Sequence, residues 1–111
     1  MKRQKKQTPV LYIDAADYGR VTFVLDGGKV LRQSYRIDPR HSHALLSRLE
    51  AFFKKAKLNA ASAPDCLGRI VINKGPGSYT GVRASLALAL ALGLAWGVPV
   101  KAVAKNAFVV M

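Results

Sequence analysis

The chain has 111 residues, of which 50% are hydrophobic and 22% are charged. This composition excludes a disordered polypeptide, and the length fits one domain with a single modest core. Its 18 Lys and Arg residues against 6 Asp and Glu residues give a formal net charge of +12. Such a charge favours contact with nucleic acid, an acidic protein or an anionic membrane surface, although a generally basic proteome would also explain it.

The N-terminal residues and the single cysteine indicate the cellular setting. Cys66 alone cannot form an internal disulfide, which fits a reducing compartment. Residues 1–8 are basic and polar, and the apolar run Val10–Ile13 that follows is stopped by Asp14, so no export signal is predicted. We therefore expect a flexible basic tail over residues 1–8, a folded domain over residues 9–111 and a cytoplasmic protein.

Three strands are predicted in the first third of the chain. Val10–Ile13 and Val21–Leu25 are short runs of strand-forming residues. The sequence Asp-Gly-Gly at residues 26–28 is a strong hairpin signal and leads into a third strand over Lys29–Ile37. That strand alternates in polarity, which is typical of a half-exposed edge strand. Val30, Arg32, Ser34 and Arg36 are expected on one side of it, and Leu31, Gln33, Tyr35 and Ile37 on the other.

A helix and two further strands are predicted next. The helix extends over residues 42–57, where apolar residues recur at spacings of three, four and seven. Arg69–Asn73 is apolar at its centre, which indicates a strand buried on both faces. Pro99–Val103 indicates a fifth strand, and residues 105–111 leave room for the start of a final helix or a tail. The sequence thus predicts an α/β domain with a five-stranded mixed sheet and two main helices.

The second of these helices is Ala- and Leu-rich and is predicted over Tyr79–Trp96. Ser78 or Thr80 can cap its start, and Gly97 can cap its end. The uncharged run Ala84–Val100 reaches the short limit for a membrane span, but the Gly and Pro residues within it favour a buried helix followed by a strand. No membrane association is therefore expected.

Leucines fall on two sides of this helix, with a stripe of small residues between them. A helix that is apolar on two sides is covered on two sides, and a small-residue stripe admits another helix at close range. We predict that a partner subunit supplies part of this cover, with burial of both sides inside the monomer as the alternative. The predicted partner-binding residues are Gly81, Ser85, Leu88, Ala89, Leu92 and Gly93.

A Gly-rich segment joins the fourth strand to this helix. Its main residues are Gly75, Pro76, Gly77, Ser78, Tyr79, Thr80, Gly81 and Arg83. A Gly-rich turn between a strand and a helix can place backbone N–H groups around a phosphate. However, its GxGxxxG spacing fits neither a P-loop nor a dinucleotide fingerprint. From the residues alone, three roles of this segment remain possible: a phosphate site, a contact with a partner protein and a turn that only packs within the chain.

No catalytic or metal-binding constellation is predicted. His41 and His43 would point about 200° apart on a helix, and no Cys or acidic ligand supports them. Asp14 ends the first strand, where either a catalytic carboxylate or a turn-forming Asp could lie. One such Asp and two unrelated histidines form neither a Ser-His-Asp triad nor a carboxylate pair.

The Gly-rich segment carries a resemblance to a known family. Residues 74–83, KGPGSYTGVR, resemble the GPGSFTGLR signature of the TsaB (YeaZ) family, with Tyr79 at the Phe position. Residues 11–16, LYIDAA, are similar to the family's opening LxIDTS strand, and residues 41–46, HSHALL, to its HSxxLL helix start. Residues 97–103, GVPVKAV, resemble its GIPLVGV segment. The central decapeptide is specific, whereas the flanking segments would be weak alone.

The resemblance extends over about residues 9–104 and implies a fold and a function. It implies one ribonuclease H-like lobe of the actin-like ATPase superfamily, the first of the family's two lobes. It also implies a non-catalytic scaffold in the bacterial synthesis of threonylcarbamoyladenosine in tRNA. Such a scaffold binds and stabilises the catalytic paralogue TsaD through its helices, is joined by the ATPase TsaE, and can form a homodimer.

This sequence departs from the family pattern in two ways. The 111 residues match only one lobe, whereas the nucleotide cleft of the superfamily lies between two lobes. Ala15 and Ala16 replace the hydroxyl residues that follow Asp14 in the family pattern. We therefore expect no enzymatic activity of its own, Asp14 as a vestigial nucleotide-site residue, ATP or ADP only at an interface with a partner, and Gly75–Arg83 as a packing hinge.

Two rival interpretations remain at this point. One is a small basic tRNA- or RNA-binding module that contacts phosphates through Arg32, Arg36 and the N-terminal tail. The other is one half of a split kinase of the actin-like fold, which would require a second chain carrying the other lobe.

Overall fold

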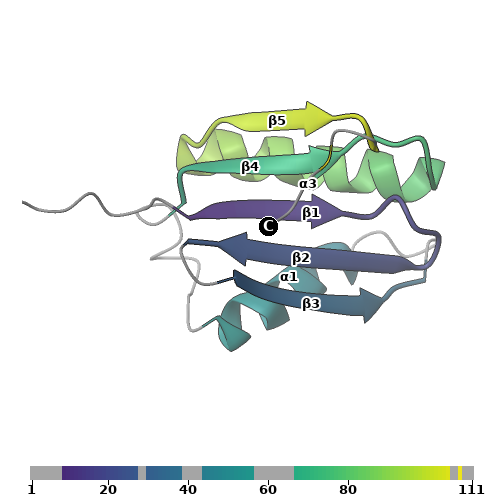
Figure 1. Cartoon of the computed structure of the whole chain (residues 1–111), viewed down its shortest axis with the longest axis horizontal. Helices are drawn as coiled ribbons and strands as arrows, with labels where there is room; N and C mark the ends of the chain where they lie inside the picture. Colours follow the sequence, from purple (N-terminus) through teal and green to yellow (C-terminus); the bar gives the residue numbers. More distant parts are fainter. Residues whose placement is uncertain (1–8, 28–29, 39–43, 57–66, 106–107, 109–111) are drawn as a thin grey trace, which may run out of the picture.

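The computed structural model describes residues 9–27, 30–38, 44–56, 67–105 and 108. Its elements in chain order (Figure 1) are β1 (Val10–Asp14), β2 (Arg20–Asp26), β3 (Val30–Arg36), α1 (Ala44–Lys55), β4 (Arg69–Asn73), α3 (Tyr79–Trp96) and β5 (Val100–Val103). The predicted α/β class is thereby confirmed. The basic tail, His41, His43 and Cys66 lie outside the described residues.

The five strands form one mixed sheet in the order β3-β2-β1-β4-β5. β1 pairs antiparallel with β2, and β2 pairs antiparallel with β3, as the hairpin signal predicts. β4 lies parallel to β1 on the other side, and β5 lies parallel to β4. Parallel neighbours need a crossover connection, and the helices α1 and α3 provide it before β4 and β5. The strand order places β1 at the centre of the sheet. Because β1 and β4 are parallel, their carboxyl ends lie side by side.

Both helices lie on the same face of the sheet, behind it in Figure 1. Alternate residues of the strands point toward them and form the core, where the rings of Phe23 in β2 and Phe52 in α1 are 5.6 Å apart. The core side chains from the sheet are Leu11, Ile13, Val21, Phe23, Ile70 and Ile72, and those from α1 are Leu45, Leu49, Phe52 and Phe53. This arrangement leaves the other face of the β2–β3 hairpin without a helix among the described residues.

The edge strand β3 confirms the predicted alternation. Val30, Arg32, Ser34 and Arg36 are exposed, whereas the residues between them are half-buried toward the helices. β4 is buried at its apolar positions on both faces, also as predicted. The alternation of side chains along a strand is a property of the backbone, which is why these two patterns could be inferred from sequence.

Candidate functional site

The carboxyl ends of β1 and β4 bring Asp14 and Asn73 together. The Asn73 Nδ2 donates a hydrogen bond to Asp14 Oδ1 at 3.1 Å, and the Ala16 N–H donates to the same oxygen at 3.1 Å. The Asn73 Oδ1 accepts a hydrogen bond from the Gly75 N–H at 2.9 Å. Asn73 is buried, so this network ties the first strand to the Gly-rich turn through one side chain. The sequence analysis missed Asn73, although a polar residue ending an apolar strand was the available signal.

The network predicts a specific loss of stability on Asn73→Ala. This change leaves the buried Gly75 N–H without its acceptor and removes the side-chain donor to Asp14, which should cost about 2 kcal/mol of unfolding free energy. Urea denaturation would measure the loss. Ser34→Ala is the control, because it removes an exposed hydroxyl pair with Thr22 and should change stability by less than about 0.5 kcal/mol. Equal stability of both variants would contradict the role given to Asn73.

The Gly-rich turn packs directly on the residues that follow β1. The Ser78 N–H donates to the Ala16 carbonyl oxygen at 2.6 Å. A Cβ at Gly77 would lie 2.5 Å from that same oxygen, and a Cβ at Gly81 would collide with the carbonyl oxygen of Ala15. These glycines are therefore required by close packing. Gly77 and Gly81 pack on the buried residues Ala15 and Ala16. This contact supports the expectation that Gly75–Arg83 acts as a packing hinge.

Several backbone donors of the turn are already used within the chain. They are the N–H groups of Gly75, Ser78, Gly81 and Val82. The Ser78 Oγ accepts from the Gly81 N–H at 3.1 Å and confirms Ser78 as the helix N-cap. Because these four donors have internal acceptors, they are not available to a phosphate.

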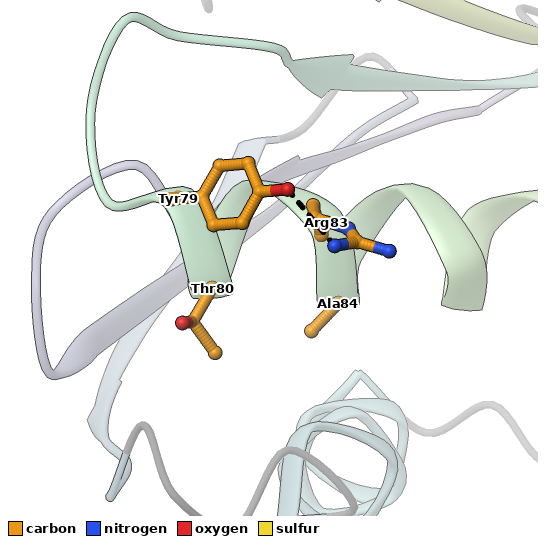
Figure 2. A pocket seen from close by; sticks show the side chains of 4 residues that line it. All are labelled: Tyr79, Thr80, Arg83 and Ala84. Carbon is orange, nitrogen blue, oxygen red and sulfur yellow. Dashed lines mark hydrogen bonds between the residues drawn. The ribbon is translucent and has the colours of Figure 1, made fainter.

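The N-terminus of α3 carries a shallow depression of about 290 Å³ (Figure 2). It is lined by Tyr79, Thr80, Arg83 and Ala84. The Arg83 guanidinium donates from Nη1 to the Tyr79 hydroxyl at 2.9 Å, and its carbon lies 5.2 Å from the centre of the Tyr79 ring. The two side chains thus hold each other on the exposed surface of the helix, as Figure 2 shows.

The small-residue stripe of α3 faces the chain's own sheet. Ser85 and Ala89 are fully buried, and a Cβ at Gly93 would lie 2.5 Å from Val100 Cγ2 of β5. Gly81 packs on Ala15, as described above. The prediction that Gly81, Ser85, Ala89 and Gly93 face a partner is therefore wrong. Small residues allow a close approach to a sheet as readily as to a second helix, and their spacing cannot distinguish the two.

The leucines of α3 divide between two environments. Leu88 and Leu92, also predicted to contact a partner, are half-buried and pack at the margin of the core. Leu90 and Leu94 lie on the opposite side of the helix, 53% and 87% exposed. The alternative in which the monomer buries both apolar sides is thereby also wrong.

The exposed side of α3 forms a continuous surface that we call the outer face. Its residues are Tyr79, Thr80, Arg83, Ala87, Leu90, Ala91 and Leu94. At about 100° per residue, they lie within about one third of the helix circumference, and only Arg83 is charged. Within the described part of the chain, α3 is also the one helix whose length and composition would allow a membrane span. Its small stripe packs on a sheet, which is typical of a core helix.

The remaining predicted residues lie apart from this region. Arg32 and Arg36 are exposed on β3, on the face of the sheet away from the helices. Across residues 9–27, 30–38, 44–56, 67–105 and 108, no three His, Cys, Asp or Glu side chains gather as metal ligands. Gly97 ends α3 in the left-handed conformation, with φ of 66°, and confirms the predicted C-cap.

Comparison with known proteins identifies relatives of this chain. The profile of the family described as TsaD, tRNA N6-adenosine threonylcarbamoyltransferase, matches residues 36–109. Over 43 residues the chain is 50% identical to the tRNA threonylcarbamoyladenosine biosynthesis protein TsaB of Bacillus subtilis (strain 168). These 43 residues are 39% of this chain and 19% of that protein.

Two solved structures share the fold. They are YeaZ from Pseudomonas aeruginosa and a protein with similarity to peptidase YEAZ from Pseudomonas aeruginosa, each with a TM-score of 0.74 and 25% sequence identity. Each match covers 88% of this chain and 44% of the other, so this chain spans less than half the length of these relatives. The chain therefore belongs to the family described as TsaD, tRNA N6-adenosine threonylcarbamoyltransferase, and consists of a ribonuclease H-like lobe of the TsaB (YeaZ) type.

Proposed function

We propose that this protein is a non-catalytic partner subunit in the synthesis of threonylcarbamoyladenosine in tRNA. In this proposal it binds and stabilises a TsaD-like catalytic paralogue in the cytoplasm. The observation that carries the proposal is the outer face of α3, where Leu94 is 87% exposed. Contiguous exposed apolar side chains of this kind mark interaction surfaces. The choice of threonylcarbamoyladenosine synthesis as the pathway rests on the name of the Bacillus subtilis relative.

The neighbouring helix α1 extends the proposed surface. α1 and α3 lie on the same side of the sheet, and the rings of Phe53 and Trp96 are 6.1 Å apart near their last turns. Leu46 of α1 is 46% exposed, which adds a further apolar side chain on this side of the molecule. The proposed contact thus involves helices 44–55 and 79–96, with the outer face replacing the small stripe predicted from sequence. Without its partner the chain would form a homodimer through the same surface, and a TsaE-like ATPase would join the assembled complex.

The proposal gives this chain no catalytic role. The Asp14 Oδ1 already accepts two hydrogen bonds from within the chain, and several N–H groups of the Gly-rich turn have internal acceptors. Both features support a packing role for this region. ATP or ADP would bind only where a partner completes a site.

The purified chain should accordingly show no ATP turnover above background. Phosphate release with Mg-ATP would measure this directly. Asp14→Asn is the comparison variant, since it keeps the side-chain shape and removes the charge. Turnover by the unaltered chain that disappears in the variant would reject the non-catalytic assignment and favour the split-kinase alternative.

A binding experiment tests the proposal as a whole. The chain and a TsaD-like protein of the same organism should sediment together, and the chain should raise threonylcarbamoyl transfer to tRNA in a reconstituted reaction. Sedimentation velocity at several concentrations of the chain alone would measure homodimer formation. The proposed function would be refuted if the two proteins did not sediment together and the chain had no effect on the transfer reaction.

A further inference from the structure

We infer that the helix-free face of the β2–β3 hairpin binds RNA, with its arginines on the phosphate backbone. The choice of RNA as the ligand rests on the proposed function in tRNA modification. The surface itself is separate from the outer face of α3, because it lies on the other side of the sheet from both helices.

The strand register brings three arginines onto this face. Arg20 in β2 lies directly opposite Arg36 in β3, and Arg32 lies opposite Val24. All three arginines are exposed, whereas Val21 and Phe23 of β2 point the other way into the core. Arg32 and Arg36 are four residues apart in one strand, so their Cα atoms are about 13 Å apart. We call Arg20, Arg32 and Arg36 the arginine row.

The pairing of Arg20 with Arg36 is unfavourable for the isolated domain. Like charges directly opposite each other on neighbouring strands destabilise a sheet, and directly opposed Cβ atoms are only about 5 Å apart. Both side chains are exposed, so neither contributes to the core. A bound polyanion would remove the repulsion and gain two charge-assisted contacts. The pair is therefore better explained by a ligand than by the needs of the fold.

The chemistry around the arginine row favours RNA over an acidic protein or a membrane. The Thr22 and Ser34 hydroxyls form a 2.8 Å hydrogen bond between the positions of Arg20–Arg36 and Arg32, which adds polar groups suited to ribose hydroxyls. Guanidinium groups match phosphate with two parallel hydrogen bonds and stack on bases. Within β2 and β3 the face exposes no aromatic side chain of the kind that is common in protein hot spots and in membrane-inserting surfaces.

An exposed aromatic ring lies at one end of the hairpin. Tyr18 is 80% exposed in the turn that precedes Arg20, at the end of the hairpin where Arg36 also lies. Exposed tyrosines are common stacking partners for unpaired bases in RNA. Three acidic residues lie near the arginine row: Asp17 is exposed in the same turn, Asp26 is half-buried at the opposite end of β2, and Asp38 after β3 is half-buried and already has an interaction partner. Within β2 and β3 themselves, the exposed charged side chains are the three arginines.

A double variant tests this inference on the whole purified chain with tRNA as the probe. In Arg20→Ala with Arg36→Ala, each lost phosphate contact should make the fall of log K with log salt less steep by about 0.7. Two lost contacts therefore weaken tRNA binding about 25-fold at about 0.1 M salt, relative to about 1 M salt where the electrostatic contribution is absent. Filter binding across a salt series would measure both quantities. The melting temperature of the variant should not fall, since the cross-strand repulsion is also removed.

The matched control is Lys54→Ala with Lys55→Ala. This variant removes the same charge from exposed positions of α1, on the helix side of the sheet, and should weaken tRNA binding less than threefold. Equal loss in both variants, or no tRNA binding by the unaltered chain, would overturn the inference. Displacement of tRNA by polyglutamate at equal charge concentration would assign the face to an acidic protein instead and would also overturn it.

The outcome is separable from that of the proposed function. The Arg20/Arg36 variant should still co-sediment with the TsaD-like protein, because the outer face of α3 is unchanged. Intact association without tRNA binding would reject only the RNA surface. Intact tRNA binding without association would reject only the partner-subunit proposal.

Discussion

Ala89→Arg should leave the domain unfolded at 25 °C, whereas Ala91→Arg should leave it folded. Ala89 is fully buried against the sheet, and Ala91 is exposed on the outer face of the same helix. An arginine at position 89 must bury an unpaired charge, which costs several kcal/mol, and must also overfill a packed contact at a further cost of about 1–3 kcal/mol. The total approaches the 5–15 kcal/mol by which domains are usually stable.

Circular dichroism and thermal melting would compare the two variants. Both carry the same substitution in the same residue type, two positions apart in one helix, so helix propensity and net charge are matched. The expected result is a cooperative melt for the Ala91 variant and none for the Ala89 variant. Similar melting of both would mean that the small stripe does not face the sheet. On the sequence alone Ala89→Arg would have been a test of association, whereas the structure makes it a test of the core.

The limits of α3 and the position of the β2–β3 hairpin could be predicted because local chemistry sets them. α3 has the predicted bounds, since the Ser78 hydroxyl caps its start and Gly97 adopts the left-handed conformation at its end. The hairpin between β2 and β3 followed from the sequence Asp-Gly-Gly at residues 26–28 between two predicted strands. Each of these signals acts within a few residues, and no tertiary contact is needed to read it.

The assignment of helix faces could not be predicted in the same way. Periodicity shows that Ser85 and Ala89 share a side of α3 with Gly93, but it does not say what covers that side. The decisive contacts join the helix to Ala15 and Val100, far away in sequence. The sequence analysis assigned the small residues to a partner, together with Leu88 and Leu92. The helix instead approaches the sheet on its small residues and leaves Leu90 and Leu94 outside.

The Gly-rich segment illustrates the same limit at the candidate site. Its resemblance to a family signature was evident from sequence, and the comparisons confirm it. Its physical role depends on Asn73 and on the Ala15-Ala16 segment, which the parallel pairing of β1 with β4 places beside it. Ala15 and Ala16 appeared in the sequence only as lost hydroxyls. In the structure they are the small surface on which Gly77 and Gly81 pack.

Leu94→Arg should abolish association through the outer face without destabilising the domain. Leu94 is 87% exposed, so an arginine there remains solvated in the free chain. In the proposed complex the leucine would contribute about 2 kcal/mol by burial, and the arginine would have to be desolvated as well. We expect the affinity for the TsaD-like partner to fall at least about 100-fold, while the melting temperature stays within a few degrees of the unaltered value.

Val30→Arg is the matched control for this prediction. Val30 is another exposed apolar residue, but it lies on β3, on the side of the sheet away from the helices. The same gain of charge at Val30 should leave partner association unchanged, because the proposed contact involves α1 and α3 only. Sedimentation velocity with the TsaD-like protein would compare the two variants at equal concentration. Undiminished association of the Leu94 variant would show that the partner binds elsewhere, since an arginine within a buried apolar contact cannot be neutral.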